Sequence, residues 1–174
     1  VLHIGLGHAA DLFVIAPCTA NTLAKLAHGL ADNLLSVTAL AMSGPILVAL
    51  AMDGGMYNAL ATQENVRILK KRGIAFVGPV EGHLASGLSG QGRMAEPVEI
   101  LGHIRLALAR NGKLAGKRLV VTAGGTQEPI DPVRYITNRS SGKMGYALAA
   151  GALARGAQVT LISGHTALTP PEGA

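Results

Sequence analysis

The sequence predicts an α/β protein built on a parallel β-sheet. Two observations predict this class: short apolar runs rich in β-branched residues alternate with longer helical patterns, and polar, glycine-containing segments follow the apolar runs. A third observation concerns the material for a core, since 49% of the 174 residues are hydrophobic and only 14% are charged. A chain of this size can bury a sizeable core and form one or two domains.

The first strand is expected at 12–17, LFVIAP, because this run is continuously apolar and partly β-branched. The helical pattern of 20–42 follows it, with a break near Gly29. The next elements, in order, are a strand at 45–52, a helix at 61–73 with Thr62 as its N-cap, a strand at 74–79 and a helix at 96–112.

The polar stretch NGKLAGKR, 111–118, is the best candidate for a domain boundary. It predicts one domain over residues 1–112 and the start of another over 113–174. Beyond it, a strand at 118–123, a loop, an apolar helical pattern and a strand at 158–163 form a second βαβ unit.

The segment 124–145 lies between the strand RLVVTA and this helical pattern, the order in which α/β proteins build phosphate sites. Backbone N–H groups near Gly124 and Gly125, with a helix N-terminus somewhere within 141–144, can point several donors at one anion. A tight turn is the simpler reading of two glycines. The segment has more donors than a turn needs, however: Arg134, Asn138, Arg139, Ser140, Ser141 and Lys143. It matches neither the Walker loop nor GxGxxG.

In the first unit, polar clusters follow each of the three strands: APCTANT (16–22), AMDGGMY (51–57) and GPVEGHLASGLSGQGRM (78–94). The carboxyl ends of parallel strands meet at one edge of a sheet, where α/β proteins bind ligands. The sequence therefore predicts one ligand site that draws on all three segments. Each cluster alone has a structural reading as well, as a helix start or as core methionines.

Composition narrows the class of partner. The net charge of +5 is compatible with nucleic acid, but only 3% of residues are aromatic and the basic residues are dispersed, so phosphorylated small molecules account for the charge equally well. No run is long and apolar enough for a membrane span, and no signal peptide is visible. We expect a cytoplasmic protein without nucleic-acid or membrane partners. Its single Cys18 cannot form an internal disulfide.

These segments resemble a known family. APCTANT is similar to its PASANT motif, AMDGGMY to PxMNxxMW, and ASGLSGQGRM to the substrate clamp of flavin-dependent cysteine decarboxylases. The 124–145 segment resembles the opening of phosphopantothenate–cysteine ligase. The order of the motifs resembles the bifunctional coenzyme A biosynthesis family, which joins phosphopantothenoylcysteine decarboxylase to that ligase. The resemblance implies a flavodoxin-like domain of the HFCD class, then the start of a Rossmann-like ligase domain, in a chain lacking both ends of the family.

The resemblance also implies roles for single residues. His3 would be a catalytic histidine, Asp53 would contact the substrate carboxylate, and Ser86 would take the place of the cysteine that protonates the enethiolate. Further residues would hold FMN (Thr19, Ala20, Asn21 and Ser36) or the substrate (Met56, Ala85, Gly87, Arg93 and Met94).

In the ligase half, Asn138 matches a residue that turns over the acyl-cytidylate. The nucleotide site would comprise Gly124, Gly125, Thr126, Ser140, Ser141, Gly142 and Lys143. CTP with Mg²⁺ is the implied cosubstrate, no metal ligand falls among the named residues, and the family implies a homo-oligomer.

Two residues depart from the family pattern. Asp53 stands where the family has Asn, and two charges about 4 Å apart repel by roughly 4 kcal/mol at an effective dielectric of about 20, so an ionised Asp53 would hinder the binding of a carboxylate. A protonated Asp53 could instead donate a hydrogen bond, if burial raised its pKa. Ser86 is a weaker acid than the usual cysteine, so protonation would be slower or come from water.

Three functions remain open on the sequence. The leading one is the bifunctional enzyme. The second is a ligase whose first domain serves only flavin binding or oligomerisation. The third is an FMN-binding interaction module without catalysis, which the donor-rich 124–145 segment disfavours.

Overall fold

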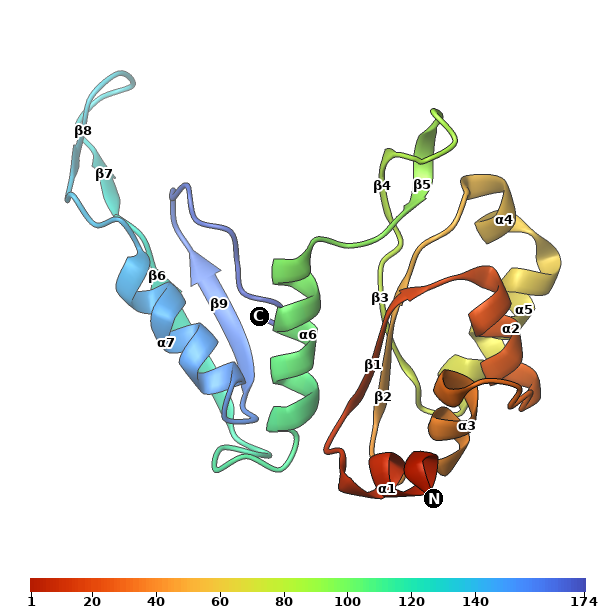
Figure 1. Cartoon of the computed structure of the whole chain (residues 1–174). Helices are drawn as coiled ribbons and strands as arrows, with labels where there is room; N and C mark the ends of the chain where they lie inside the picture. Colours follow the sequence, from red (N-terminus) through yellow and green to blue (C-terminus); the bar gives the residue numbers. More distant parts are fainter. The chain divides into compact units, whose positions relative to one another are not determined.

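The computed structural model describes residues 1–174, which form two compact units, Val1–Ile104 and Arg105–Ala174. In the first unit, a parallel sheet of order β1-β2-β3 lies among helices, and an antiparallel hairpin of β4 and β5 follows (Figure 1). Its elements are α1 (Leu2–Ala9), β1 (Phe13–Cys18), α2 (Ala20–His28), α3 (Leu34–Ala41), β2 (Ile46–Leu50), α4 (Gly54–Asn58), α5 (Leu60–Lys71), β3 (Ala75–Val77), β4 (Val80–His83), β5 (Ser89–Arg93) and α6 (Pro97–Ala109).

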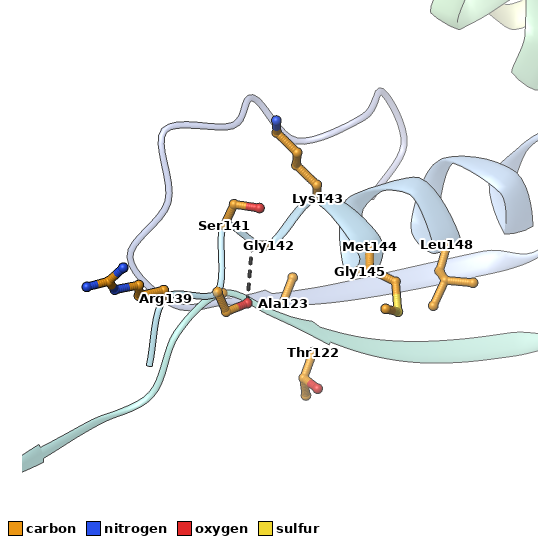
Figure 2. Close-up of a pocket in the computed structure, with 11 residues that line it drawn as sticks. Thr122, Ala123, Arg139, Ser141, Gly142, Lys143, Met144, Gly145 and Leu148 are labelled. Atoms are coloured by element: carbon orange, nitrogen blue, oxygen red, sulfur yellow. Dashed lines mark hydrogen bonds between the residues drawn. The ribbon is translucent and has the colours of Figure 1, made fainter. Parts of the chain in front are cut away.

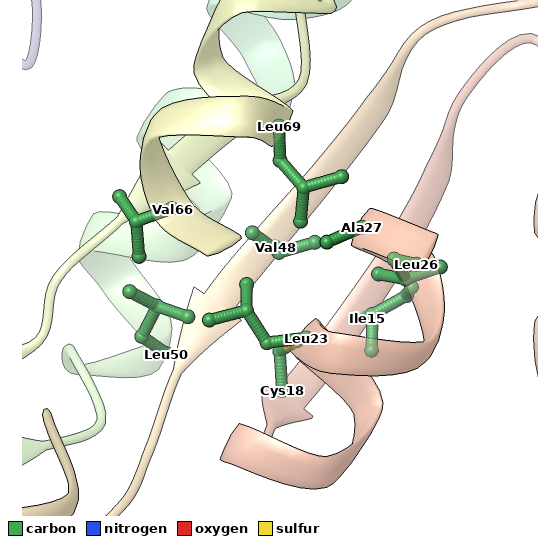
Figure 3. Packing of buried hydrophobic residues seen from close by; sticks show 9 residues of the cluster. All are labelled: Ile15, Cys18, Leu23, Leu26, Ala27, Val48, Leu50, Val66 and Leu69. Atoms are coloured by element: carbon green, nitrogen blue, oxygen red, sulfur yellow. The ribbon is translucent and has the colours of Figure 1, made fainter. Parts of the chain in front are cut away.

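The sheet is buried on both faces, which explains its continuous apolar strands. On one face, Leu23 of α2 and Leu69 of α5 pack on Val48 of β2 (Figure 3). On the other face, Leu47 of β2 packs with Ile100 of α6. The predicted strands β1, β2 and β3 are confirmed, as are the predicted helices: the pattern broken near Gly29 forms α2 and α3, and the later two form α5 and α6. The helices α1 and α4 were not predicted.

Cys18 lies at the end of β1 within the first of these clusters and is fully buried. Burial raises the pKa of its thiol to about 12, so the thiol stays protonated at neutral pH. Cys18 is a core residue, available neither to a disulfide nor to a ligand.

The second unit is a smaller βαβ arrangement in which β6 pairs in parallel with β9 and α7 packs on one face of the pair. Ala149 and Leu153 of α7 contact Val159 of β9 in its core. The segment between β6 and α7 contains a short antiparallel hairpin, β7–β8. The elements are β6 (Arg118–Ala123), β7 (Gln127–Pro129), β8 (Tyr135–Thr137), α7 (Lys143–Leu153) and β9 (Gln158–Ser163).

The division between the units falls inside α6, earlier than the polar stretch 111–118 that the sequence favoured. The physical reason is that α6 contributes to two cores: Ile104 packs with the first unit, whereas Leu106 packs with the second. The domain limits 1–112 and 113–174 stay a prediction.

Three local predictions need correction. Thr62 is not an N-cap but a buried residue inside α5, whose N-cap position is Ala59. Residues of the 78–94 and 124–145 segments, expected as loops, form the hairpins β4–β5 and β7–β8.

No helix of the structure is long and apolar enough to cross a membrane.

Candidate functional site

The first candidate site lies at the carboxyl edge of the sheet in the first unit, where β1 leads into α2. Thr19 is the N-cap of α2, and its hydroxyl accepts a hydrogen bond from the Thr22 N–H at 3.4 Å. Asn21, in the first turn of α2, is exposed. A helix N-terminus with an exposed amide and hydroxyl is suited to hydrogen-bond acceptors of a ligand.

Asp53 follows β2 and caps α4, because its Oδ1 accepts from the Gly55 N–H at 2.9 Å. Its other oxygen, Oδ2, accepts from the Ser86 hydroxyl at 2.7 Å. The structure thus joins two predicted site residues that lie 33 positions apart.

These hydrogen bonds determine the charge of Asp53. The Ser86 hydroxyl and then the Gly55 N–H stabilise the carboxylate and hold its pKa below the usual range. The direction of this shift is opposite to the one that a protonated Asp53 requires, so Asp53 is an anion in the ligand-free protein. A protonated Asp53 beside a bound carboxylate stays a prediction.

The β4–β5 hairpin contacts the segment that follows β2 through backbone atoms. The Met52 N–H donates to the Gly92 carbonyl at 2.9 Å. Gly92 has φ 151°, and a Cβ there would lie 2.2 Å from the Met52 carbonyl oxygen, so only glycine fits. This close approach places the hairpin loop with Ser86 over Asp53.

The other residues predicted to bind the substrate differ in their surroundings, and not all of them lie beside the Asp53–Ser86 contact. Ala85 and Gly87 are exposed on either side of Ser86, and Met56 is half exposed on α4. Arg93 forms an ion pair with Glu96. Met94 is partly buried and packs against the core of the first unit, and its contact with the substrate stays a prediction.

His3 and Ser36 do not join the site within this unit. His3 lies on α1, which Figure 1 shows at the opposite end of the sheet from α4 and the β4–β5 hairpin. Ser36 is 2% exposed, and it completes a capping box with Asn33 at the start of α3. Its side chain stabilises a helix end, and a role for Ser36 in holding FMN stays a prediction.

A second candidate site, in the second unit, is a pocket of about 590 Å³ at the start of α7 (Figure 2). The helix begins at Lys143 after Gly142, within the range that the sequence indicated. Predicted residues that line the pocket are Gly124, Ser140, Ser141, Gly142 and Lys143.

Glycines bring α7 close to β6 at this pocket. A Cβ at Gly145 would lie 2.6 Å from the Ala123 Cβ, and one at Gly142 would lie 3.2 Å from the Gly124 nitrogen. Gly124 and Gly142 have positive φ of 99° and 75°, which glycine adopts without strain. The N-terminus of α7 consequently opens directly beside the end of β6.

Asn138 organises the loop in front of this helix. Its Oδ1 accepts from the Ser140 N–H at 3.0 Å, and its Nδ2 donates to the Thr126 hydroxyl at 3.3 Å. Gly125, Thr126 and Asn138 are not among the residues that line the pocket. Arg134, expected among the donors, instead pairs with Asp131 in the β7–β8 turn.

Several pocket residues were missed by sequence reasoning. Met144 and Leu148 lie four positions apart on one side of α7 and are 78% and 60% exposed, while the Lys143 side chain points the other way (Figure 2). Their spacing on a helix was the available signal. The other missed residues are Thr122, Ala123 and Gly145, whereas Arg139, named among the donors of the segment, does line the pocket.

Comparison with known proteins agrees with this geometry. The flavoprotein family model, described as "Flavoprotein", matches residues 1–108. The chain belongs to the flavoprotein family. A second model, the "DNA/pantothenate metabolism flavoprotein C-terminal domain", matches residues 114–174.

The curated relatives carry both regions in one chain. The chain is 46% identical over 175 residues to the Coenzyme A biosynthesis bifunctional protein CoaBC of Bacillus subtilis (strain 168), and 51% identical over 178 residues to that of Mycobacterium tuberculosis (strain ATCC 25618 / H37Rv). Each match covers 99% of this chain but 43% of the relative. The predicted resemblance to this bifunctional family is thus confirmed.

Solved structures support the fold of the first unit. A PPC decarboxylase mutant complexed with pantothenoylaminoethenethiol matches with a TM-score of 0.60 and 45% identity, over 61% of this chain and 59% of that one. The FMN binding protein AtHal3 matches with a TM-score of 0.55 and 44% identity, over 61% and 58%. The α/β class with a parallel sheet, and the flavoprotein character, are confirmed.

Proposed function

We propose that residues 1–112 belong to an FMN-dependent domain that decarboxylates 4'-phosphopantothenoylcysteine to 4'-phosphopantetheine. The observation that carries this proposal is the Ser86–Asp53 hydrogen bond at the carboxyl edge of a flavoprotein sheet, the edge from which α2 with Asn21 also starts. The PPC decarboxylase and the FMN-binding relative, which match this region, support it. A flavodoxin-like strand order belongs to the same proposal.

The residues around α2 fit part of the requirement for FMN. Thr19, Ala20 and Asn21 present a hydroxyl, helix-end N–H groups and an amide at an open edge. These donors suit the carbonyl and phosphate oxygens of a flavin nucleotide. Bound there, FMN would supply the electron acceptor that thiol oxidation needs before the carboxylate is lost.

The charge of Asp53 constrains how a cysteinyl substrate lies. An ionised carboxylate repels another carboxylate, and no cation forms an ion pair with Asp53. The substrate carboxylate is therefore directed away from Asp53.

We further propose that residues 113–174 begin a Rossmann-like ligase domain that joins 4'-phosphopantothenate to cysteine with CTP and Mg²⁺. The pocket at the start of α7 supports it, because free backbone N–H groups and Lys143 can bind phosphate oxygens. Asn138 would hold the loop in shape through Thr126 and Ser140. A cytoplasmic homo-oligomer acting on phosphorylated small molecules completes the proposal.

The decarboxylase is tested by measuring release of carbon dioxide from 4'-phosphopantothenoylcysteine by the intact protein that carries residues 1–174. Turnover that depends on FMN is expected. Stoichiometric flavin without turnover would instead favour the binding module or a ligase whose first domain is inactive.

The ligase is tested by CMP formation from CTP in the presence of 4'-phosphopantothenate and cysteine. Lys143→Met is expected to raise the KM for CTP about 10-fold, since it removes a charge-assisted contact. Lys113→Met, a matched change at an exposed lysine outside the pocket, should leave that KM unchanged. Equal effects of both variants would contradict the assignment of the pocket.

A further inference from the structure

The Asp53–Ser86 contact has a definite direction. The serine hydroxyl carries one proton, and at 2.7 Å from Oδ2 of an ionised carboxylate that proton is donated to Asp53. The remaining hydrogen-bonding capacity of the Ser86 oxygen is its lone pairs. Toward a ligand, Ser86 is therefore an acceptor.

Asp53 has the same character. Oδ1 accepts from the Gly55 N–H and Oδ2 from Ser86, and an ionised carboxylate has further lone pairs but no proton to give. Arg93, the cation of the adjoining hairpin, is paired with Glu96 instead. The two side chains thus form an uncompensated acceptor surface that favours a donor group on the ligand.

We propose that Asp53 and Ser86 form an acceptor pair that recognises the thiol of the substrate by accepting a hydrogen bond from its S–H group. The proposal rests on the proposed function, because a cysteinyl substrate presents one S–H donor next to a carboxylate that Asp53 repels. It assigns Ser86 a role opposite to that of an acid: the residue accepts a hydrogen bond from the substrate, because its own proton is donated to Asp53.

The contact transfers no proton. The pKa of Asp53 lies below its ordinary value, so the carboxylate stays ionised and the thiol keeps its S–H bond while it donates to the pair.

The test compares the affinity of two ligands for the intact flavin-loaded protein, kept reduced under anaerobic conditions so that the thiol is not oxidised. The ligands are 4'-phosphopantothenoylcysteine and its S-methyl thioether, which lacks only the donor. Hydrogen bonds to a charged acceptor predict a preference for the thiol of about 10-fold or more.

Single substitutions test whether the Asp53–Ser86 pair causes the preference for the thiol. In Asp53→Asn and in Ser86→Ala the preference for the thiol should fall below about 3-fold. The first variant removes the charge of the acceptor pair, and the second removes its hydroxyl oxygen. Ser89→Ala is the matched control, since Ser89 lies on the same hairpin outside the pair and should keep the wild-type preference.

Each outcome is decisive. A wild-type protein that binds both ligands equally overturns the inference while leaving the proposed substrate intact. A preference that survives in both Asp53→Asn and Ser86→Ala also overturns it. If neither ligand binds to flavin-loaded protein, the proposed decarboxylase fails, and the inference with it.

Discussion

Single hydrogen bonds decide the chemistry available to Asp53 and Ser86. Neither residue type alone indicates whether it gives or takes a proton, and the sequence left both options open. The 2.7 Å contact, together with the Gly55 N–H, assigns the proton to the serine and the charge to the aspartate. This pairing could not be predicted, because it depends on a tertiary contact between a helix cap and a hairpin loop.

Asp131 provides a pH-dependent test at the same scale. Its carboxylate accepts from the Val133 and Arg134 N–H groups and pairs with the Arg134 side chain, and these contacts hold its pKa below the ordinary value. A lowered folded pKa means that the stabilisation is present above the unfolded pKa and is lost as pH falls through the folded value.

Amide hydrogen exchange at Val133 and Arg134, corrected for intrinsic rates, should therefore show protection that is constant above about pH 4 and decreases below it. Asp131→Asn should reduce that protection at neutral pH. Protection that already declines between about pH 6 and 5 would contradict the assignment, because a lowered carboxyl pKa cannot produce it.

Gly145 determines how closely α7 approaches β6. A Cβ at this position would lie 2.6 Å from the Ala123 Cβ and 2.8 Å from the Thr122 carbonyl oxygen. Gly145→Ala should lower the free energy of unfolding by about 1–3 kcal/mol, as overpacking does. Chemical denaturation measures the change.

Gly151→Ala on the same helix is the control. The nearest atom to its added Cβ would be the flexible Arg155 side chain, at 3.5 Å. Because alanine favours helix over glycine, a gain of about 0.5–1 kcal/mol is expected there. Destabilisation of similar size at both glycines would show that close packing on β6 is not the cause.

At the scale of elements, the packing of α2 on the sheet should dominate the stability of the first unit. Leu23 is fully buried against β2, so Leu23→Ala should lower the free energy of unfolding by about 2–5 kcal/mol. Leu60→Ala, at a residue 89% exposed on α5, should change it by less than about 0.5 kcal/mol. Thermal or urea unfolding distinguishes the two; equal effects would refute the core assignment.

The strands and helices could be predicted where a periodic apolar pattern specifies them. The runs around β1, β2, β6 and β9 are apolar because they lie within a sheet, and Gly29 ends α2 in the left-handed conformation, with φ 71°. The hairpin β4–β5 could not be predicted this way, because its strands are polar and glycine-rich and are held by backbone hydrogen bonds.

The edge of the sheet was predictable for a related reason. Parallel strands end on one side, so clusters that follow β1 and β2 had to converge there. Which side chains face a ligand was less predictable. Ser36 completes a capping box at the start of α3, and Met94, at the end of a matching motif, is partly buried against the core.

At the scale of the whole molecule, two units carry two separate candidate sites, one at the edge of a flavoprotein sheet and one at the start of α7. The chain spans 43% of the length of the bifunctional relatives it matches. Both activities are therefore assigned as proposals to the intact protein, with the residues named here as the parts that this chain contributes.

The central claim is that the edge of the first sheet binds FMN through the start of α2. A titration of the intact protein with FMN, followed by flavin absorbance or fluorescence, tests it most directly. The account predicts saturation at about one flavin per chain and affinity weakened about 10-fold by Asn21→Leu, but not by Asn111→Leu at an exposed asparagine outside the site. Saturable binding that is unchanged in Asn21→Leu, or no binding at all, would contradict it.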